Sequence, residues 1–258
     1  MINIVKYFSL ASLALLSNPA TAQYINGYAS SVYLFGTNVA QTGPNANISY
    51  VNMYDRSIFD HDGGSVSWAF LHDQSTENVR ATQSWLYTYD QAAATIGSGA
   101  NMSGIIMAGQ STAVLNGGNL GLAVVGGNAS ANLDMSSGAT VSGLWFANSG
   151  GAAVIRGYGL AATQSVVSGQ SATGTPFSIN VTFTPCDWGV GCLGTPIDAA
   201  NYAGLQLINL GAVPTPPPPP VPGTVPDAPA WTMLILGFGF VGAQVRVRRT
   251  ESRRLLAG

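Results

Sequence analysis

Apolar and polar residues alternate through the middle of the chain, and this pattern predicts β-strands. Residues 65–70 and 85–89 place valine or aromatic side chains at every second position. A period of two, bounded by Gly, Pro, Asn and Ser, is typical of strands with one buried face. No segment between residues 23 and 212 has a capped apolar stripe with the 3.6-residue period of a helix. The clearest alternation sets Phe177, Ile179, Val181 and Phe183 against Ser178, Asn180 and Thr182.

The strands are short and turn residues are frequent, so we expect residues 23–212 to form an all-β sandwich or jelly roll. Residues 91–155 are dense in Gly, Ser, Ala and Asn, and Asp134 is their only charged residue. Gly117-Gly118-Asn119 recurs nine residues later as Gly126-Gly127-Asn128. We interpret these as turns of successive hairpins. A β-solenoid, which needs at least three stacked units, is the alternative.

The first 22 residues have the layout of a secretory signal peptide. Lys6 supplies the positive charge, residues 7–16 are mainly apolar, and Ala20-Thr21-Ala22 is a small-residue cleavage site before Gln23. The apolar run is too short to anchor the chain in a membrane. We therefore expect export, with cleavage between Ala22 and Gln23.

Residues 213–226 form a linker that holds eight of the chain's 14 prolines. Polyproline II geometry, at about 3.1 Å per residue, predicts a semi-rigid stalk of roughly 40 Å. Residues 227–254 then contain an apolar run followed by arginines, including Arg246, Arg248 and Arg249. The run predicts a short transmembrane helix of roughly 24 Å with its arginines in the cytoplasm. Small residues on this helix offer a packing face, formed by Gly237, Gly239 and Gly242.

The tail resembles the PEP-CTERM sorting module of exported Gram-negative proteins, also named the ice-binding protein C-terminal domain. Pro226 matches the first proline of the motif and Trp231 its tryptophan, whereas Asp227 and Ala228 stand where the family has Glu and a second Pro. The resemblance covers about 30 residues. It implies sorting and cleavage by an exosortase, a membrane protease, and delivery to the cell envelope or the exopolysaccharide.

Composition excludes some classes of partner and of fold. Residues 23–225 contain three arginines against nine acidic residues, a net charge of −6. Such a surface repels nucleic acid. A hydrophobic fraction of 47% is too high for a disordered chain. Cys186 and Cys192 are an even pair in an exported protein, and we expect them to form a disulfide.

Candidate chemistry is confined to a polar cluster at residues 55–77, which holds five acidic residues and both histidines. Asp60 and Asp62, in the segment Asp-His-Asp-Gly-Gly, are oxygen donors of the kind that Ca²⁺ prefers. The alternative, which we expect, is a solvated turn. The sequence has no nucleophile elbow, phosphate-binding loop, dinucleotide fingerprint or zinc-protease motif. No cofactor is expected.

These features predict a non-enzymatic, exported structural protein of the envelope or exopolysaccharide, with the body outside the cytoplasm or released to the matrix. The first alternative is a carbohydrate- or ice-binding adhesin on the same anchor, which flat rows of threonine or aromatic residues on one sheet would favour. The second is a cation-dependent hydrolase, which would need the polar cluster to converge in a pocket.

Overall fold

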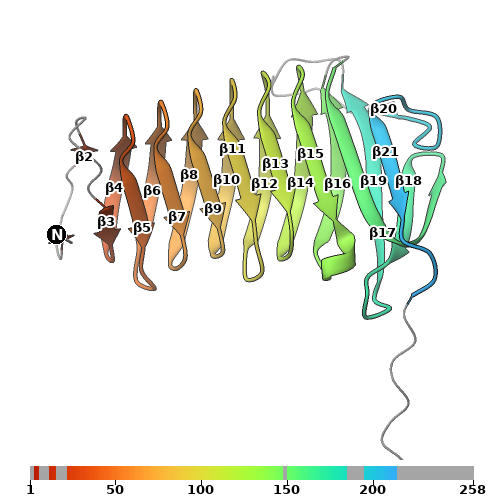
Figure 1. The fold of residues 1–258 in the computed structure, drawn as a ribbon, viewed down its shortest axis with the longest axis horizontal. Helices are drawn as coiled ribbons and strands as arrows, with labels where there is room; N and C mark the ends of the chain where they lie inside the picture. The colour runs from red at the N-terminus through yellow and green to blue at the C-terminus, as the bar shows by residue number, and fades with distance from the viewer. Residues whose placement is uncertain (1–2, 6–11, 16–21, 148–149, 185–194, 214–258) are drawn as a thin grey trace, which may run out of the picture. The chain divides into compact units, whose positions relative to one another are not determined.

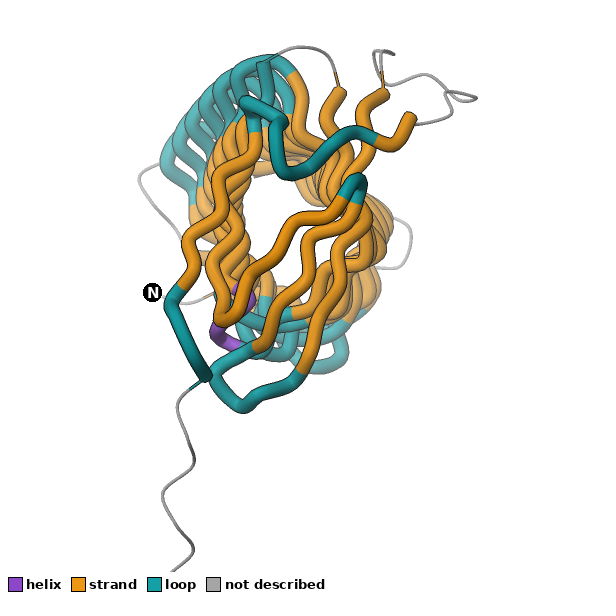
Figure 2. The backbone as a smooth tube through the Cα atoms, turned by 90° about the vertical axis from the view of Figure 1, so that its right-hand side faces the viewer, coloured by secondary structure: helices purple, strands orange, loops and turns teal. Residues whose placement is uncertain are grey.

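The chain folds into a β-solenoid of about seven turns. The computed structural model describes residues 3–5, 12–15, 22–147, 150–184 and 195–213. Successive strands stack side by side along the long axis of this part of the chain (Figure 1). Each coil contributes one strand to each of two sheets, which face one another across a core (Figure 2).

We name the two walls sheet A and sheet B. Sheet A consists of β1 (Asn3–Val5), β3 (Ala22–Ile25), β5 (Val39–Thr42), β7 (Ile58–His61), β9 (Thr76–Val79), β11 (Ala93–Ile96), β13 (Thr112–Leu115), β15 (Ser130–Asp134), β17 (Ala152–Thr163) and β21 (Leu205–Asn209). Sheet B consists of β2 (Ser12–Leu15), β4 (Tyr28–Leu34), β6 (Asn47–Met53), β8 (Ser65–Leu71), β10 (Thr82–Thr88), β12 (Asn101–Met107), β14 (Asn119–Gly126), β16 (Thr140–Ala147), β18 (Val166–Gln170), β19 (Pro176–Thr184) and β20 (Thr195–Pro196). A 3-10 turn, η1 (Met135–Ser137), precedes β16.

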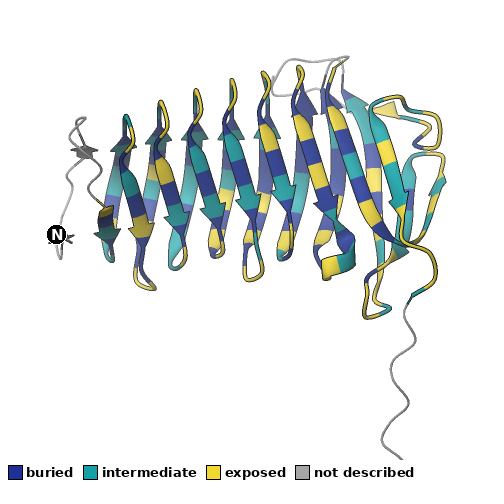
Figure 3. Cartoon of the chain, viewed as in Figure 1, coloured by how far each residue is buried: buried dark blue, intermediate teal, exposed yellow. Residues whose placement is uncertain are grey.

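Neighbouring coils pair in parallel and in register, so equivalent residues form straight columns across each sheet. In sheet B, Val32 faces Val51, which faces Ala69, which faces Leu86. These columns point inward and are fully buried, and together they form one continuous hydrophobic core. Buried and exposed positions therefore alternate along every coil (Figure 3). The burial of inward-facing side chains between two sheets is the main stabilising term of such a fold.

The sheet B strands share a pattern of burial although their amino-acid sequences are not obviously alike. Their second, fifth and seventh residues are buried, and the third and fourth are mostly at least partly exposed. The third residue is serine in six of seven coils, and glycine in the remaining one. This column consists of Ser30, Ser49, Ser67, Ser84, Ser103, Gly121 and Ser142.

The expected sandwich with successive hairpins is wrong, whereas the all-β class and the alternative of a solenoid are confirmed. All pairings between β4 and β16 are parallel. The two Gly-Gly-Asn copies lie at opposite corners of the solenoid, because the first precedes β14 and the second follows it. Glycine and asparagine suit both hairpin turns and solenoid corners. The residues of a corner therefore do not reveal that the partner strand is one coil away.

The C-terminal end of the solenoid departs from the repeat. β18 pairs antiparallel with β17 and β19, and β20 pairs antiparallel with β19. Leu160, Phe177 and Tyr202 pack against the core at this end. At this end, antiparallel strands and partly buried side chains therefore replace the regular coils.

Several predicted features lie outside the described residues: the cysteine pair, all but the first residue of the 213–226 linker, and the 227–254 tail with its sorting motif, glycines and arginines. Within the described part of the chain, no helix has the length and apolar character needed to cross a bilayer.

Candidate functional site

The most distinctive surface of the molecule is the outer face of the first four coils of sheet B. In β4, β6, β8 and β10, the fourth and sixth residues and the residue that follows each strand face outward and are mostly aromatic. We call this surface the aromatic platform. Its members are Tyr33, Phe35, Tyr50, Tyr54, Trp68, Phe70, His72, Trp85, Tyr87 and Tyr89.

One column of the platform is a continuous ring stack at the ends of the strands. The ring centroids of Phe35 and Tyr54 are 5.1 Å apart, as are those of Tyr54 and His72, and those of His72 and Tyr89 are 4.9 Å apart. Interplanar angles of 7° to 10° make these rings nearly parallel. Parallel strands lie about 4.8 Å apart, and in-register pairing therefore sets the rings at stacking distance.

The other columns continue this surface across the middle of the strands. Tyr87 stacks on Phe70 with centroids 5.0 Å apart and on Trp68 with centroids 5.9 Å apart. Trp85 lies over Gly104, where an added Cβ would be 2.3 Å from the indole Cζ3. The missing side chain of Gly104 therefore makes room for the indole against the sheet. Tyr50 retains 47% of its surface exposed, so the platform faces solvent.

Hydroxyl groups run beside the rings. The serine column of sheet B crosses the platform at Ser30, Ser49, Ser67 and Ser84, all partly or largely exposed. Within the described residues, no side-chain hydrogen bond is formed by these hydroxyls. They remain able to donate to and accept from a ligand.

A ladder of polar turns borders the platform where sheet B strands end. Asp55, Asp73 and Asp90 occupy equivalent corners in left-handed backbone conformation, with φ of 60°, 57° and 53°. The Oδ2 atom of Asp55 accepts a hydrogen bond from the Gly36 N–H at 2.9 Å. In the same way, Asp73 Oδ2 accepts from the Asp55 N–H at 3.0 Å, and Asp90 Oδ2 accepts from the Asp73 N–H at 3.3 Å, each donor lying one coil earlier. One carboxylate oxygen of each aspartate thus stabilises the stack of corners.

The residues after these aspartates form a second ladder. Arg56 Nε donates to Gln74 Oε1 at 3.1 Å, and Gln74 Nε2 donates to Gln91 Oε1 at 3.2 Å. Together with Gly36, Thr37 and the three aspartates, these side chains line an open groove of about 750 Å³. The groove is rich in carboxylate, amide and guanidinium groups, and it adjoins the ring stack because each aspartate directly follows a stacked residue.

The strands under the platform carry no acidic or strongly basic side chain. The strands of sheet B from β4 to β16 contain no Asp, Glu, Lys or Arg. Burial raises the pKa of the Tyr87 and Tyr89 phenols above its ordinary value near 10. These phenols therefore stay protonated and can donate hydrogen bonds. An uncharged aromatic surface bordered by polar groups suits a ligand with both apolar faces and hydroxyls.

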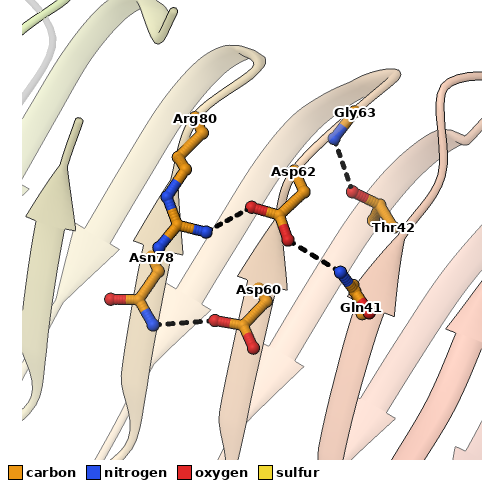
Figure 4. Close-up of polar contacts among 7 residues, drawn as sticks. All are labelled: Gln41, Thr42, Asp60, Asp62, Gly63, Asn78 and Arg80. Carbon is orange, nitrogen blue, oxygen red and sulfur yellow. Dashed lines mark hydrogen bonds and ion pairs between the residues drawn. The ribbon is translucent and has the colours of Figure 1, made fainter. Parts of the chain in front are cut away.

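The structure places the predicted cation ligands elsewhere, on the outer face of sheet A (Figure 4). Asn78 Nδ2 donates to Asp60 Oδ1 at 2.7 Å. Asp62 accepts from Gln41 Nε2 at 2.8 Å and forms an ion pair with Arg80. Both carboxylates thus have protein partners, and the described residues contain no group of three or more side chains arranged to hold a metal ion.

The rest of the polar cluster is divided among three environments. Asp55 and Asp73 belong to the corner ladder and His72 to the ring stack, whereas His61 and Glu77 are buried in the core. Proximity in sequence therefore does not produce convergence in space, because successive residues of a strand alternate between the inside and the outside of the solenoid.

Sequence reasoning noted the strand alternation of Trp68, Phe70, Trp85 and Tyr87 but missed the platform that they form. The signal was present as a recurring tetrapeptide, aromatic or His, then Asp, then Arg or Gln, then Ser or Ala. It occurs at residues 54–57, 72–75 and 89–92. The intervals of 17 and 18 residues are one coil each.

Comparison with known proteins gives no further assignment, since no family model, no curated protein and no solved structure matches this chain.

Proposed function

We propose that this protein is an exported surface protein that binds an uncharged polysaccharide along its aromatic platform. The observation that supports the proposal is the platform itself: nine aromatic residues and His72 on one flat, in-register sheet face. An exposed apolar surface of this kind, bordered by polar groups, is typical of a binding site.

The chemistry of a sugar ring fits this surface. A pyranose has faces of C–H groups and a rim of hydroxyls. The C–H faces pack on the negatively charged faces of aromatic rings, which also bury apolar area. The hydroxyls find partners in the serine column on one side and in the groove of aspartate, glutamine and arginine side chains on the other. A repeating ligand matches a repeating site, because each of the first four coils presents aromatic rings beside a serine hydroxyl.

Charge favours a neutral glycan over an anionic one. Asp55, Asp73 and Asp90 border the platform, while Arg56 is the only cation in the groove. The net charge of −6 between residues 23 and 225 adds a repulsive field against uronic acid or sulfate groups. Carboxylates accept hydrogen bonds from neutral hydroxyls without this penalty.

The leader, stalk and tail support a location at the cell envelope. Cleavage after Ala22 would deliver the body outside the cytoplasm, and the proline-rich stalk would hold it away from the membrane. Sorting and cleavage of the tail by an exosortase would then place the protein on the surface or in the exopolysaccharide. At either place, a protein that binds polysaccharide would be in contact with its ligand.

Binding is tested with soluble neutral glucans and mannans and with a polyuronate, by calorimetry on the purified chain. We expect Trp68→Ala and Trp85→Ala each to weaken binding of a neutral glycan by about tenfold, or ~1.4 kcal/mol. The matched control is Trp145→Ala, which removes an indole from the same face of sheet B outside the platform. The proposal fails if no neutral glycan binds, or if the Trp145 variant loses as much affinity as the platform variants.

Location is tested separately by cell fractionation and intact mass. The mature chain should begin at Gln23, and deletion of residues 231–254 should release the body from the membrane fraction. Replacing Ala228 with Pro restores the family motif and should increase tail processing. Retention of Met1 on the envelope protein, or membrane association of the truncated chain, contradicts the proposed sorting.

A further inference from the structure

The first residues of the chain extend both sheets beyond the coils that form the body. β1 pairs in parallel with β3, with Ile4 opposite Tyr24, and β2 pairs in parallel with β4, with Leu13 opposite Val32. These two strands lie wholly within residues 1–22, the leader that we propose is removed on export. The cleavage bond follows Ala22, which is the first residue of β3.

Removal of the leader therefore leaves the N-terminal end of the solenoid open. β3 and β4 become edge strands, and the backbone groups that pair with β1 and β2 lose their partners. The inward-facing Ile25, Val32 and Leu34, all buried in the structure, lose the coil that covers them on this side. Solenoid ends generally need a polar cap for solubility, and the mature first coil has none.

The exposed edge also lacks the devices that protect natural edge strands. From Gln23 to Tyr54 there is no Asp, Glu, Lys, Arg or His, and neither β3 nor β4 contains proline. Charged side chains and prolines are the usual means of preventing edge-to-edge pairing. The opposite end of the solenoid is different, because β18 and β20 there pair antiparallel with strands of the same chain.

We propose that two mature chains join through their N-terminal edges in a two-fold symmetric dimer. A two-fold axis normal to the sheets sets β4 antiparallel to β4 of the second copy and brings the two open core ends together. The occupant is a second copy because the contact is self-complementary: each chain supplies an uncharged edge and an apolar end. The dimer rests on the proposed export, since it forms only when the leader is gone.

This arrangement would extend the glycan-binding surface. The aromatic platform begins on β4, the strand at the junction, and continues through β6, β8 and β10. The two-fold axis keeps the outer faces of both sheets B on the same side. Two platforms would then form one surface, and a long polysaccharide chain bound at one would meet the second at high effective concentration.

The test uses the chain that begins at Gln23 after an initiator methionine, with its linker and tail, in detergent and without glycan. Light scattering measures the oligomeric state over a range of protein concentrations, and hydrogen exchange measures the protection of the β4 amides. Ser30→Lys places a charge on the edge strand. The matched control is Ser49→Lys, the equivalent serine one coil further along the same face.

We expect a dimer whose β4 amides become protected as concentration rises, with both effects lost in the Ser30 variant and retained in the Ser49 variant. A monomer at all concentrations overturns the proposal. A dimer that is weakened equally by both substitutions also overturns the proposal. A dimer in which the β4 amides stay unprotected does so too, because it indicates contact through the tail. Because this chain is made without the leader and tested without glycan, these outcomes are independent of whether export or glycan binding is confirmed.

Discussion

The buried carboxyl group of Glu77 makes the stability of the solenoid depend on pH. Glu77 lies on β9 with its side chain inside the core and no exposed surface. Its one hydrogen-bond partner among the described residues is Gln83, whose Nε2 is 3.5 Å from Oε2, and Oε1 has no partner. Burial raises the pKa of Glu77 from 4.5 to about 8. The carboxyl group is therefore mainly protonated in the folded protein at neutral pH.

The direction in which the free energy of unfolding changes with pH follows from proton linkage. The unfolded chain releases the Glu77 proton above pH 4.5, whereas the folded chain keeps it up to about pH 8. Stability from this group is fully present below pH 4.5 and is lost as pH rises towards 8. At about 1.4 kcal/mol per pH unit, the free energy of unfolding should fall by roughly 2 kcal/mol between pH 6.5 and 8.

His61, one coil away in the same core, acts in the opposite direction. Burial lowers its pKa below the ordinary value of 6.5, and hydrogen bonding to Gln83 offsets part of this effect. The stability that neutral His61 contributes is present above pH 6.5 and is lost as pH falls through its lowered folded pKa. Measurements between pH 6.5 and 8 therefore keep the contribution of His61 small beside that of Glu77.

The assay is guanidinium unfolding followed by tryptophan fluorescence at several pH values in this window. Glu77→Gln keeps the volume and one acceptor but removes the titration, so we expect its free energy of unfolding to fall by less than half as much as that of the wild type. Asp60→Asn, on the outer face of sheet A, shows how much of any change follows from net charge alone. Equal pH slopes for the wild type and the Glu77 variant would refute the reasoning.

Two further substitutions test the platform and its border. Gly104→Ala would place a methyl group in the volume that Trp85 occupies, and we expect a loss of about 1–3 kcal/mol in unfolding free energy together with weaker glycan binding; Gly27→Ala, where an added Cβ contacts nothing within 4 Å, is the control and should change neither. Asp73→Ala removes the acceptor of the Asp55 N–H and puts alanine at φ 57°, which should cost about 2 kcal/mol in denaturant unfolding, whereas Asp73→Asn should cost less than half as much. Equal losses for the two Asp73 variants would show that neither the acceptor nor the backbone conformation matters there.

The alternation of apolar and polar residues was sufficient to predict an all-β body, because a two-residue period is a local property of a strand. It was not sufficient to predict how the strands pair. A hairpin and a solenoid coil both need short strands and corners rich in glycine, asparagine and aspartate. The two differ in the distance to the partner strand, which is one coil of 17 to 22 residues between β3 and β17.

For the candidate site, too, the sequence predicts the residue types but not their arrangement. The aromatic identities of Trp68, Phe70, Trp85 and Tyr87 can be read from the sequence, and so can the separation of the charged residues from these strands. Whether such rings fill a core or cover a surface depends on which side of the sheet the alternation faces. In sheet B the inward positions already hold smaller aliphatic residues such as Val51, Ala69 and Leu86, and the large rings are therefore placed outside.

The positions of the acidic residues in the polar cluster at residues 55–77 were decided by the tertiary structure alone. The sequence shows five acidic residues and two histidines within 23 positions, which predict a solvated turn, with a cation site as the alternative. Stacking of the coils instead places Asp60 and Asp62 on sheet A, Asp55 and Asp73 at a corner, and Glu77 in the core. The sequence by itself determined which segments form strands, which form corners and which residues are charged, because these properties depend on residues close together in the chain. The tertiary structure decided which strands pair, which face of the sheet each side chain lies on and how deeply it is buried. In a solenoid these properties depend on contacts between residues one full coil apart.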